Sequence, residues 1–349
     1  MKIRKLHIDN YKVFQDFNLD FTNNGKAQSL VAIAGINGSG KTTLLKDFIY
    51  PIFHKKTILN NSFIQIEYQE NHYNKTLNID TNFISDNVSF PKLQNILFYQ
   101  AGVTENQSAK EIIIQFIDHL IYEQDQKSSE AYFATQEILQ SIFPDFNLQI
   151  EFKGIDKRRQ VLFKNERSDN ITIDDLSNGE QELITKAFSL YLSDVKDHII
   201  LIDEPESSLH PNWQSQIAHI YQEFANKNNN QIILATHSPH IVASIHKEQI
   251  RVLVKQNHKI RAIDSFTGSY GWRVDRVLLE IFRLQGLRTP LVERKLDHLR
   301  KMIFSDQYTT EEFKHLENEL METIGYDDMD LSLTRMEIAK RKIKSEANL

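Results

Sequence analysis

The stretch Gly35-Ile36-Asn37-Gly38-Ser39-Gly40-Lys41-Thr42 decides the fold of this 349-residue chain. It fits the pattern G-x-x-x-x-G-K-[ST] at every position, and glycines in such a loop let backbone N–H groups converge on phosphate oxygens. The apolar run Ser29–Ala34 precedes it, and a helical pattern follows from about Lys41 until just before Pro51. The sequence therefore predicts a phosphate-binding loop between a buried strand and a helix N-terminus.

The residue types in this loop match the tasks of binding a nucleotide. We expect the Lys41 ammonium to reach the β- and γ-phosphates and the Thr42 hydroxyl to bind Mg²⁺, so ATP and Mg²⁺ are the predicted cofactors. The alternative is a glycine-rich turn without a ligand. The residues expected to bind the nucleotide are Gly35, Asn37, Gly38, Ser39, Gly40, Lys41, Thr42 and Thr43.

Composition excludes several classes of protein. The chain has no cysteine, which excludes a disulfide scaffold and thiolate metal sites and fits a reducing compartment. A net charge of -6 argues against a generally basic nucleic-acid-binding surface, so any such contact needs a local basic patch. The N-terminus lacks a signal-peptide pattern, and no apolar run approaches the ~20 residues of a membrane span. We expect a cytoplasmic protein with no membrane part.

Buried strands alternate with helices along much of the chain, which predicts an α/β fold with a mixed, mainly parallel sheet. Hairpin patterns at Lys2–Asp20 and Ser62–Asp80 predict an antiparallel N-terminal β subdomain beside it. We expect an ATPase-type domain over residues 1–265 with a helical insert at 104–145. A helical region over 266–349 is expected to serve oligomerisation or partner binding.

Two adjacent carboxylates follow the apolar strand Ile199–Ile202. Ligands bind at the carboxyl ends of strands in open α/β sheets. We therefore expect Asp203 to bind Mg²⁺, directly or through water, and Glu204 to polarise the attacking water. A charged turn after a strand is the alternative. Glu206 is interpreted as solvated or structural rather than catalytic.

Three further features follow predicted strands or open a helix. His237 follows the strand Ile232–Ala235 and would donate to a γ-phosphate, so it joins Lys41 and Glu204 as a candidate catalytic residue. Gln100 ends another strand and is a candidate Mg²⁺ ligand, although one glutamine carries little information. The third feature is the segment Ser177, Asn178 and Gly179, which opens a predicted helix. It is either a capping box or an anion-binding helix N-terminus that faces a second nucleotide.

In this order the motifs resemble the ABC ATPase superfamily, and they resemble its RecF/SMC/OLD-like branch most. The resemblance covers roughly Met1–Asp264 and implies that ATP is held between two heads of a homodimer or higher oligomer. Ser177 and Gly179 would then act in trans on the partner's ATP. Two residues depart from the family pattern, because Lys12 stands where arginine is usual and Asn178 where transporters have glycine.

The tail resembles antiphage ATPases of the Septu type, on the residues Gly268–Gly271, Asp275, Leu278-Leu279 and Glu311–Asp328. That resemblance implies a regulator of a separate effector, expected to be an HNH-type nuclease, in Septu or retron defence. The chain itself shows no nuclease-like constellation. The alternatives are a RecF-like DNA-repair ATPase and the nucleotide-binding subunit of an ABC transporter. The basic clusters Lys157–Arg159 and Lys340–Lys344 are interpreted as solvated charge, with nucleic-acid contact as the alternative.

Overall fold

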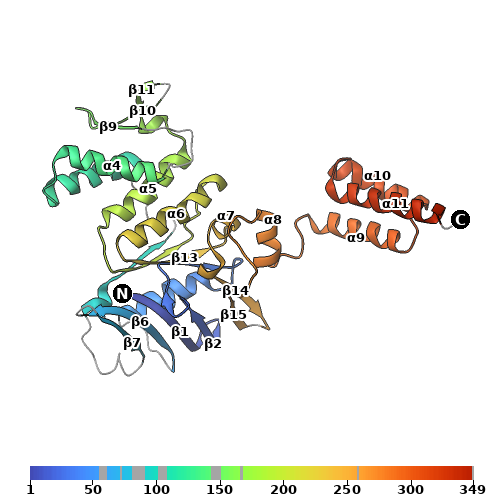
Figure 1. The fold of residues 1–349 in the computed structure, drawn as a ribbon, viewed down its shortest axis with the longest axis horizontal. Coiled ribbons are helices and arrows are strands. Elements are labelled where there is room, and N and C mark those ends of the chain that lie inside the picture. Colours follow the sequence, from blue (N-terminus) through green and yellow to red (C-terminus); the bar gives the residue numbers. More distant parts are fainter. Residues whose placement is uncertain are drawn as a thin grey trace. The chain divides into compact units, whose positions relative to one another are not determined.

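The computed structural model describes residues 1–54, 61–70, 73–80, 91–100, 108–142, 151–165, 168–257 and 259–347. It contains two compact units, Met1–Val277 and Leu278–Leu349, both drawn in Figure 1. The boundary lies after the expected residue 265 because the next segment belongs to the first unit. There the Ser269 hydroxyl donates to Ile245 O (2.6 Å) and the Gly271 N–H donates to Ala243 O (2.8 Å).

The central sheet of the first unit confirms the predicted α/β fold. Its six strands run in the order β15-β14-β5-β13-β12-β8, and all neighbours are parallel except β14 and β15. Strands β5, β12 and β13 are buried at every residue, as parallel strands covered on both faces are. The strands are β5 (Leu30–Ala34), β8 (Ile96–Gln100), β12 (Ile199–Asp203), β13 (Gln231–Thr236), β14 (Ile250–Gln256) and β15 (Lys259–Ile263).

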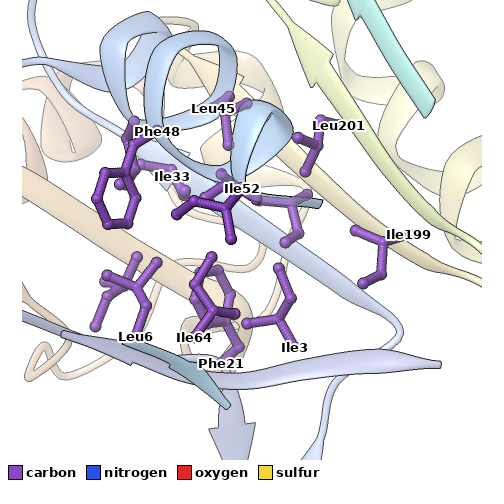
Figure 2. Close-up of a cluster of buried hydrophobic side chains, with 14 of the residues drawn as sticks. Ile3, Leu6, Phe21, Ile33, Leu45, Phe48, Ile52, Ile64, Ile199 and Leu201 are labelled. Carbon is purple, nitrogen blue, oxygen red and sulfur yellow. The ribbon is translucent and has the colours of Figure 1, made fainter. Parts of the chain in front are cut away.

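A four-stranded antiparallel sheet of order β2-β1-β6-β7 forms the predicted N-terminal β subdomain. Its strands are β1 (Lys2–Tyr11), β2 (Phe14–Asp20), β6 (Phe63–Glu70) and β7 (Tyr73–Ile79); a two-stranded ribbon, β3 (Thr22–Asn23) and β4 (Lys26–Ala27), follows β2. The helix after the glycine loop packs between the two sheets. Figure 2 shows its Leu45, Phe48 and Ile52 side chains above those of β1 and β6 and beside those of β5 and β12.

The predicted helix end before Pro51 is wrong. A π-helical segment, η1 (Thr43–Ile49), continues directly into α1 (Tyr50–Phe53), with Pro51 in the first turn of α1. The Tyr50 N–H donates to Leu45 O, five residues earlier, so the chain is wound more widely just before the proline. Pro51 lacks an N–H and is tolerated where a new helical turn begins. Ile52 and Phe53 consequently extend the buried face of this helix.

Helices α5 (Asn178–Leu192) and α6 (Pro211–Lys227) lie on the other side of β13 from β1 and β6 (Figure 1). The described part of the predicted insert is helical: α3 (Ala109–Asp118), η3 (His119–Glu123) and α4 (Ser128–Ile142). Phe116 of α3 meets Phe188 of α5 edge-on at 5.3 Å between ring centroids. Residues 104–107 and 143–145 of the insert lie outside the described residues. A three-stranded sheet follows the insert: β9 (Glu151–Ile155), β10 (Val161–Asn165) and β11 (Ser168–Thr172).

The first unit also contains two short helices, α7 (Pro239–Ala243), which precedes β14, and α8 (Val274–Arg276), which follows β15. The second unit is helical, as expected, and consists mainly of α9 (Pro290–Phe304), α10 (Glu311–Ile324) and α11 (Met329–Ala347). Its core holds Leu296, Leu299, Met302, Ile303, Phe313, Leu320 and Leu331. Within the described ranges, no helix is both long and apolar enough to cross a membrane.

Candidate active site

The central sheet brings the predicted motifs to one edge. Strands β5, β13 and β12 are adjacent and parallel, with Thr236 opposite Ala34 and Asp203 opposite Ala235. Their carboxyl ends therefore carry the glycine loop, the histidine segment and the acidic pair side by side. Gln100 lies opposite Asp203 at the end of β8, but its side chain lies outside the described residues.

The glycine loop holds its lysine inward. Lys41 is only 6% exposed, and its ammonium donates to the carbonyl oxygens of Gly35 (2.7 Å) and Ile36 (3.1 Å). Burial lowers the pKa of Lys41, while the charges of Glu206, Glu204 and Asp203 oppose that change. The buried Ser39 hydroxyl has no hydrogen-bond partner among the described residues. A buried cation and an unpaired donor therefore lie in a loop of converging backbone.

Gly40 is required by both backbone conformation and space. Its φ is +89°, and a Cβ there would lie 3.0 Å from Phe14 Cζ and 3.2 Å from Val13 Cγ2. The same strand turn carries Lys12, whose ammonium lies 2.6 Å from Asp47 Oδ2 on the helix after the loop. Lys12 is thus paired with a carboxylate.

Asp203 and Thr42 meet directly beneath the loop. The Thr42 hydroxyl donates to Asp203 Oδ1 at 3.2 Å, and Asp203 is only 3% exposed. Burial raises the pKa of the Asp203 carboxyl, and the Thr42 hydrogen bond opposes this rise. The neighbouring Glu204 has φ +53°, a left-handed conformation that is rare outside glycine. A hydroxyl and a carboxylate oxygen in contact are suitable ligands for Mg²⁺.

Glu206, which the sequence left as either solvated or structural, takes the structural role. It is 4% exposed, and its Oε1 accepts hydrogen bonds from the Thr236 hydroxyl (2.8 Å), the His237 N–H (2.6 Å) and the Ser238 N–H (3.1 Å). Its Oε2 is buried without a partner in the described part of the chain. Glu206 therefore fixes the backbone at the end of β13. The sequence signal for this role was the presence of a third acidic residue close to Asp203 and Glu204.

The His237 ring lies between two carboxylates. Its Nδ1 is 3.2 Å from Glu206 Oε1 and 3.7 Å from Glu204 Oε1. The structure thus brings His237 near Glu204, the other candidate catalytic residue, and nearer still to Glu206, which was not predicted to be catalytic.

The predicted signature segment opens α5 as a capping box. Ser177 Oγ accepts from the Glu180 N–H (3.4 Å), and Glu180 Oε2 accepts from the Ser177 N–H (2.6 Å). A Cβ on Gly179 would lie 3.0 Å from the Trp213 indole, so close packing against α6 also favours glycine there. Ser177 and Asn178 are exposed, and no hydrogen bond within the described chain connects them to the glycine loop.

These residues fit a magnesium nucleotide. The loop offers a buried ammonium, an unpaired hydroxyl and glycine backbone for phosphate oxygens, and the Thr42–Asp203 pair offers oxygen ligands for the metal. In the described residues, this edge of the sheet included, no group of three or more His, Asp or Glu side chains could hold a metal. Each of the two basic clusters has a paired arginine, with Arg159 on Asp118 and Arg341 on Asp306, both at 2.7–2.8 Å. This pairing reduces the charge available to nucleic acid.

Comparison with protein families now decides the class. The family described as "AAA domain, putative AbiEii toxin, Type IV TA system" matches residues 60–243, more than half of the chain. The chain belongs to this AAA-domain family. A second AAA-domain model matches residues 1–70, so the glycine loop lies in one match and Asp203, Glu204 and His237 lie in the other. Both parts of the candidate site therefore lie within AAA-domain matches.

Relatives of this AAA-domain protein include two named after retron and Septu systems. Retron Ec83 probable ATPase of Escherichia coli is 31% identical over 41% of this chain and 26% of its own length. Septu protein PtuA of Bacillus thuringiensis is 31% identical over 30% of this chain and 27% of its own length. The matched segment thus spans about a quarter of either relative. The resemblance to ATPases of the RecF/SMC/OLD type is confirmed.

A lipoprotein-releasing ATP-binding protein and an SMC head domain also match. LolD, the lipoprotein-releasing system ATP-binding protein of Rickettsia bellii, is 28% identical over 65% of this chain and 80% of its own length. Among solved structures, the SMC head domain of Thermotoga maritima has a TM-score of 0.48 and 16% identity over 76% of this chain and 100% of that one.

Proposed function

We propose that this AAA-domain protein binds ATP with Mg²⁺ at the edge formed by β5, β12 and β13 and hydrolyses it there. The observation that carries the proposal is the 3.2 Å contact between Thr42 of the glycine loop and Asp203 at the end of β12. That contact brings together Thr42 and Asp203, two of the three predicted metal-binding residues, which are far apart in sequence. Bound MgATP would supply the phosphoanhydride bond that is broken.

The chain's own residues divide the work as follows. Lys41 exchanges its two carbonyl acceptors for phosphate oxygens and neutralises their charge. Glu204 orients the attacking water and accepts its proton. His237 donates toward the γ-phosphate, and the carboxylate of Glu206 holds it in position through three hydrogen bonds to its strand end. Gln100 remains a candidate metal ligand on the strength of its place beside Asp203 alone.

The second half of the site would come from another copy of the chain. Ser177, Asn178 and Gly179 present an exposed helix N-terminus, a place where anions bind. In a two-fold dimer this segment of one copy would face the γ-phosphate bound to the other. Hydrolysis would then remove the group that joins the two heads and so switch the dimer between states.

The head dimer can be tested with one variant and a matched control. In a Glu204→Gln background, ATP should convert the chain to a stable head dimer, measured by light scattering. Ser177→Arg should abolish this ATP-dependent increase in mass. Ser128→Arg, at the start of α4, should leave it intact. An increase in mass that survives Ser177→Arg would refute the trans arrangement.

The physiological role we propose is regulation of a partner effector, an HNH-type nuclease, in antiphage defence in the cytoplasm. It is supported by the similarity to the retron and Septu proteins. The test is co-purification of the tagged chain with the products of neighbouring genes, followed by phage plating on cells carrying the whole cluster. Protection should be lost with Lys41→Ala and Glu204→Gln. Full protection by either variant would contradict this role.

A transporter subunit is the second candidate, because LolD matches over most of its own length. That role predicts that the chain fractionates with membranes through a permease. Purification of an active ATPase from the soluble fraction, with no membrane protein attached, would exclude it.

A further inference from the structure

The last helix of the chain, α11, is apolar on two opposite faces. Most of the large apolar side chains that are exposed in the described residues belong to the unit Leu278–Leu349. The longest regular series of them lies on α11. A soluble helix packed on one side usually presents charged and polar residues on the other. The second apolar face therefore needs an explanation.

The inner face of α11 is already in use within its own unit. Leu331 is fully buried, Thr334 is nearly so, and Ile338 packs against the same cluster of α9 and α10 side chains. The start of the helix is also fixed, because Arg288 donates to Asp328 and Asp330 at 2.8–3.0 Å. These contacts determine which side of α11 faces outward.

The outer face carries Met329, Leu333, Met336 and Ile343, between 53% and 72% exposed. Lys340, also exposed, occupies the position between Met336 and Ile343. The five residues follow one another at intervals of four, three, four and three, which is the spacing of a coiled-coil seam. At about 100° per residue they lie opposite Leu331 and Ile338. We call these five residues the α11 seam.

We propose that the α11 seam pairs in antiparallel orientation with the α11 seam of a second copy of this chain. A two-fold axis makes a seam self-complementary, so one helix supplies both sides of the contact. The partner must be a helix with the same apolar spacing, and this chain provides one. This association is separate from the ATP-dependent head dimer and goes beyond it.

Charge selects the antiparallel orientation. Parallel pairing would place the Lys340 ammonium groups of the two copies against each other within the seam. Antiparallel pairing in the register that matches Leu333 with Ile343 places Lys340 opposite Met336 and beside Glu337 of the second copy. It also aligns the two helix dipoles favourably.

Sedimentation of the full chain tests the seam. We would use a Lys41→Ala background without nucleotide, so that the head dimer cannot contribute. The wild-type seam should give twice the chain mass of 40.8 kDa at micromolar concentration. Leu333→Glu with Met336→Glu should weaken association at least tenfold, whereas Leu284→Glu with Leu287→Glu, a matched pair of exposed leucines, should not. Unchanged association of the seam variant, or a wild-type monomer, would overturn the proposal.

A variant that strengthens association excludes misfolding as the reason for weaker association in the glutamate variants. Lys340→Leu removes the one charge from the seam, and a polar residue at such a position fixes register at the expense of affinity. We expect association about tenfold tighter. Glu322→Leu, on the exposed side of α10, should leave it unchanged. Equal tightening by both variants would show nonspecific stickiness and overturn the proposal.

Disulfide mapping tests the orientation, because the chain has no cysteine of its own. Chains carrying Met336→Cys and chains carrying Lys340→Cys should cross-link to each other when co-expressed and co-purified. Each variant alone should cross-link several-fold less. Cross-linking strongest for Met336→Cys alone would indicate a parallel pair and overturn the antiparallel arrangement.

Discussion

The two units of the chain treat charge and apolar surface in opposite ways. In Met1–Val277 the charges of Lys41, Asp203 and Glu206 are almost completely buried at one edge of a sheet. In Leu278–Leu349 the charges form surface pairs such as Arg288–Asp328, while an apolar seam on α11 is exposed. Buried charge without full pairing suits a small ionic ligand, and an exposed apolar stripe suits a macromolecule. The proposed catalytic site and the proposed assembly surface therefore lie in different units of the chain.

Glu204→Gln should have the largest effect and should confine it to the first unit. Without a carboxylate to accept the proton from water, ATP turnover should fall by about 10²–10⁴-fold. Nucleotide affinity should stay within about threefold, since the phosphate-binding groups remain. Phosphate release and nucleotide titration measure the two quantities. The control is Glu223→Gln, an exposed carboxylate on α6. Turnover at the wild-type rate would break the assignment.

Glu206→Gln should have the next largest effect. The amide keeps one acceptor for the strand end of β13, but it removes the charge that faces His237 Nδ1 at 3.2 Å. We expect kcat to fall by roughly 10–100-fold with little change in KM, on the scale of one misplaced acid–base group. A purely structural role would instead lower the melting temperature while leaving kcat of the folded fraction intact.

Gly40→Ala should moderately reduce both stability and ATP affinity, and the control variant Gly325→Ala distinguishes the two effects. Gly40 and Gly325 both have positive φ, but a Cβ meets neighbouring atoms only at Gly40. Left-handed strain should cost each alanine variant about 1–3 kcal/mol of stability. Only Gly40→Ala should also weaken ATP binding, by about tenfold, because Phe14 and Val13 must move. Equal ATP affinity in both variants would contradict the close approach.

The smallest effect concerns Asp328 in the second unit. Burial raises the pKa of its carboxyl, but the hydrogen bonds and charge of Arg288 together hold it below the ordinary value. This contribution to stability is present above the ordinary pKa of about 3.9 and is lost only as pH falls through the lower folded value. We expect hydrogen-exchange protection of α11 to be equal at about pH 7 and pH 5, after correction for intrinsic rates. Asp328→Asn should reduce protection at both, by about 1 kcal/mol or less.

Sequence was sufficient where a local pattern determines the outcome. The run of glycines before Lys41 and the apolar strand before Asp203 each specify a short element by themselves. Parallel neighbours then bring those elements to one edge of the sheet. Both the α/β fold and the grouping of the loop, the acidic pair and His237 followed from these local signals.

Three features depended on contacts that no local pattern contains. The sequence alone cannot distinguish a solvated from a structural Glu206, because the three donors that hydrogen-bond to it lie on the distant end of β13. The helix continues past Pro51 because a wide turn precedes it. The α11 seam was not recognised because the helix has apolar residues on two opposite faces, and a search for one apolar face does not detect such a helix. Which face packs inward depends on α9 and α10.

The left-handed backbone of Glu204 has a consequence for the evolution of this fold. A glutamate held at φ +53° opposes the intrinsic preference of its own peptide, at about 1–3 kcal/mol. Glycine would relieve that strain, so Glu204→Gly should melt a few degrees higher than the active protein while hydrolysing no ATP. Glu204→Gln, which keeps the strained backbone, should gain no such heat resistance. Selection for thermal robustness alone would therefore favour glycine at this position, at the expense of the proposed ATP turnover.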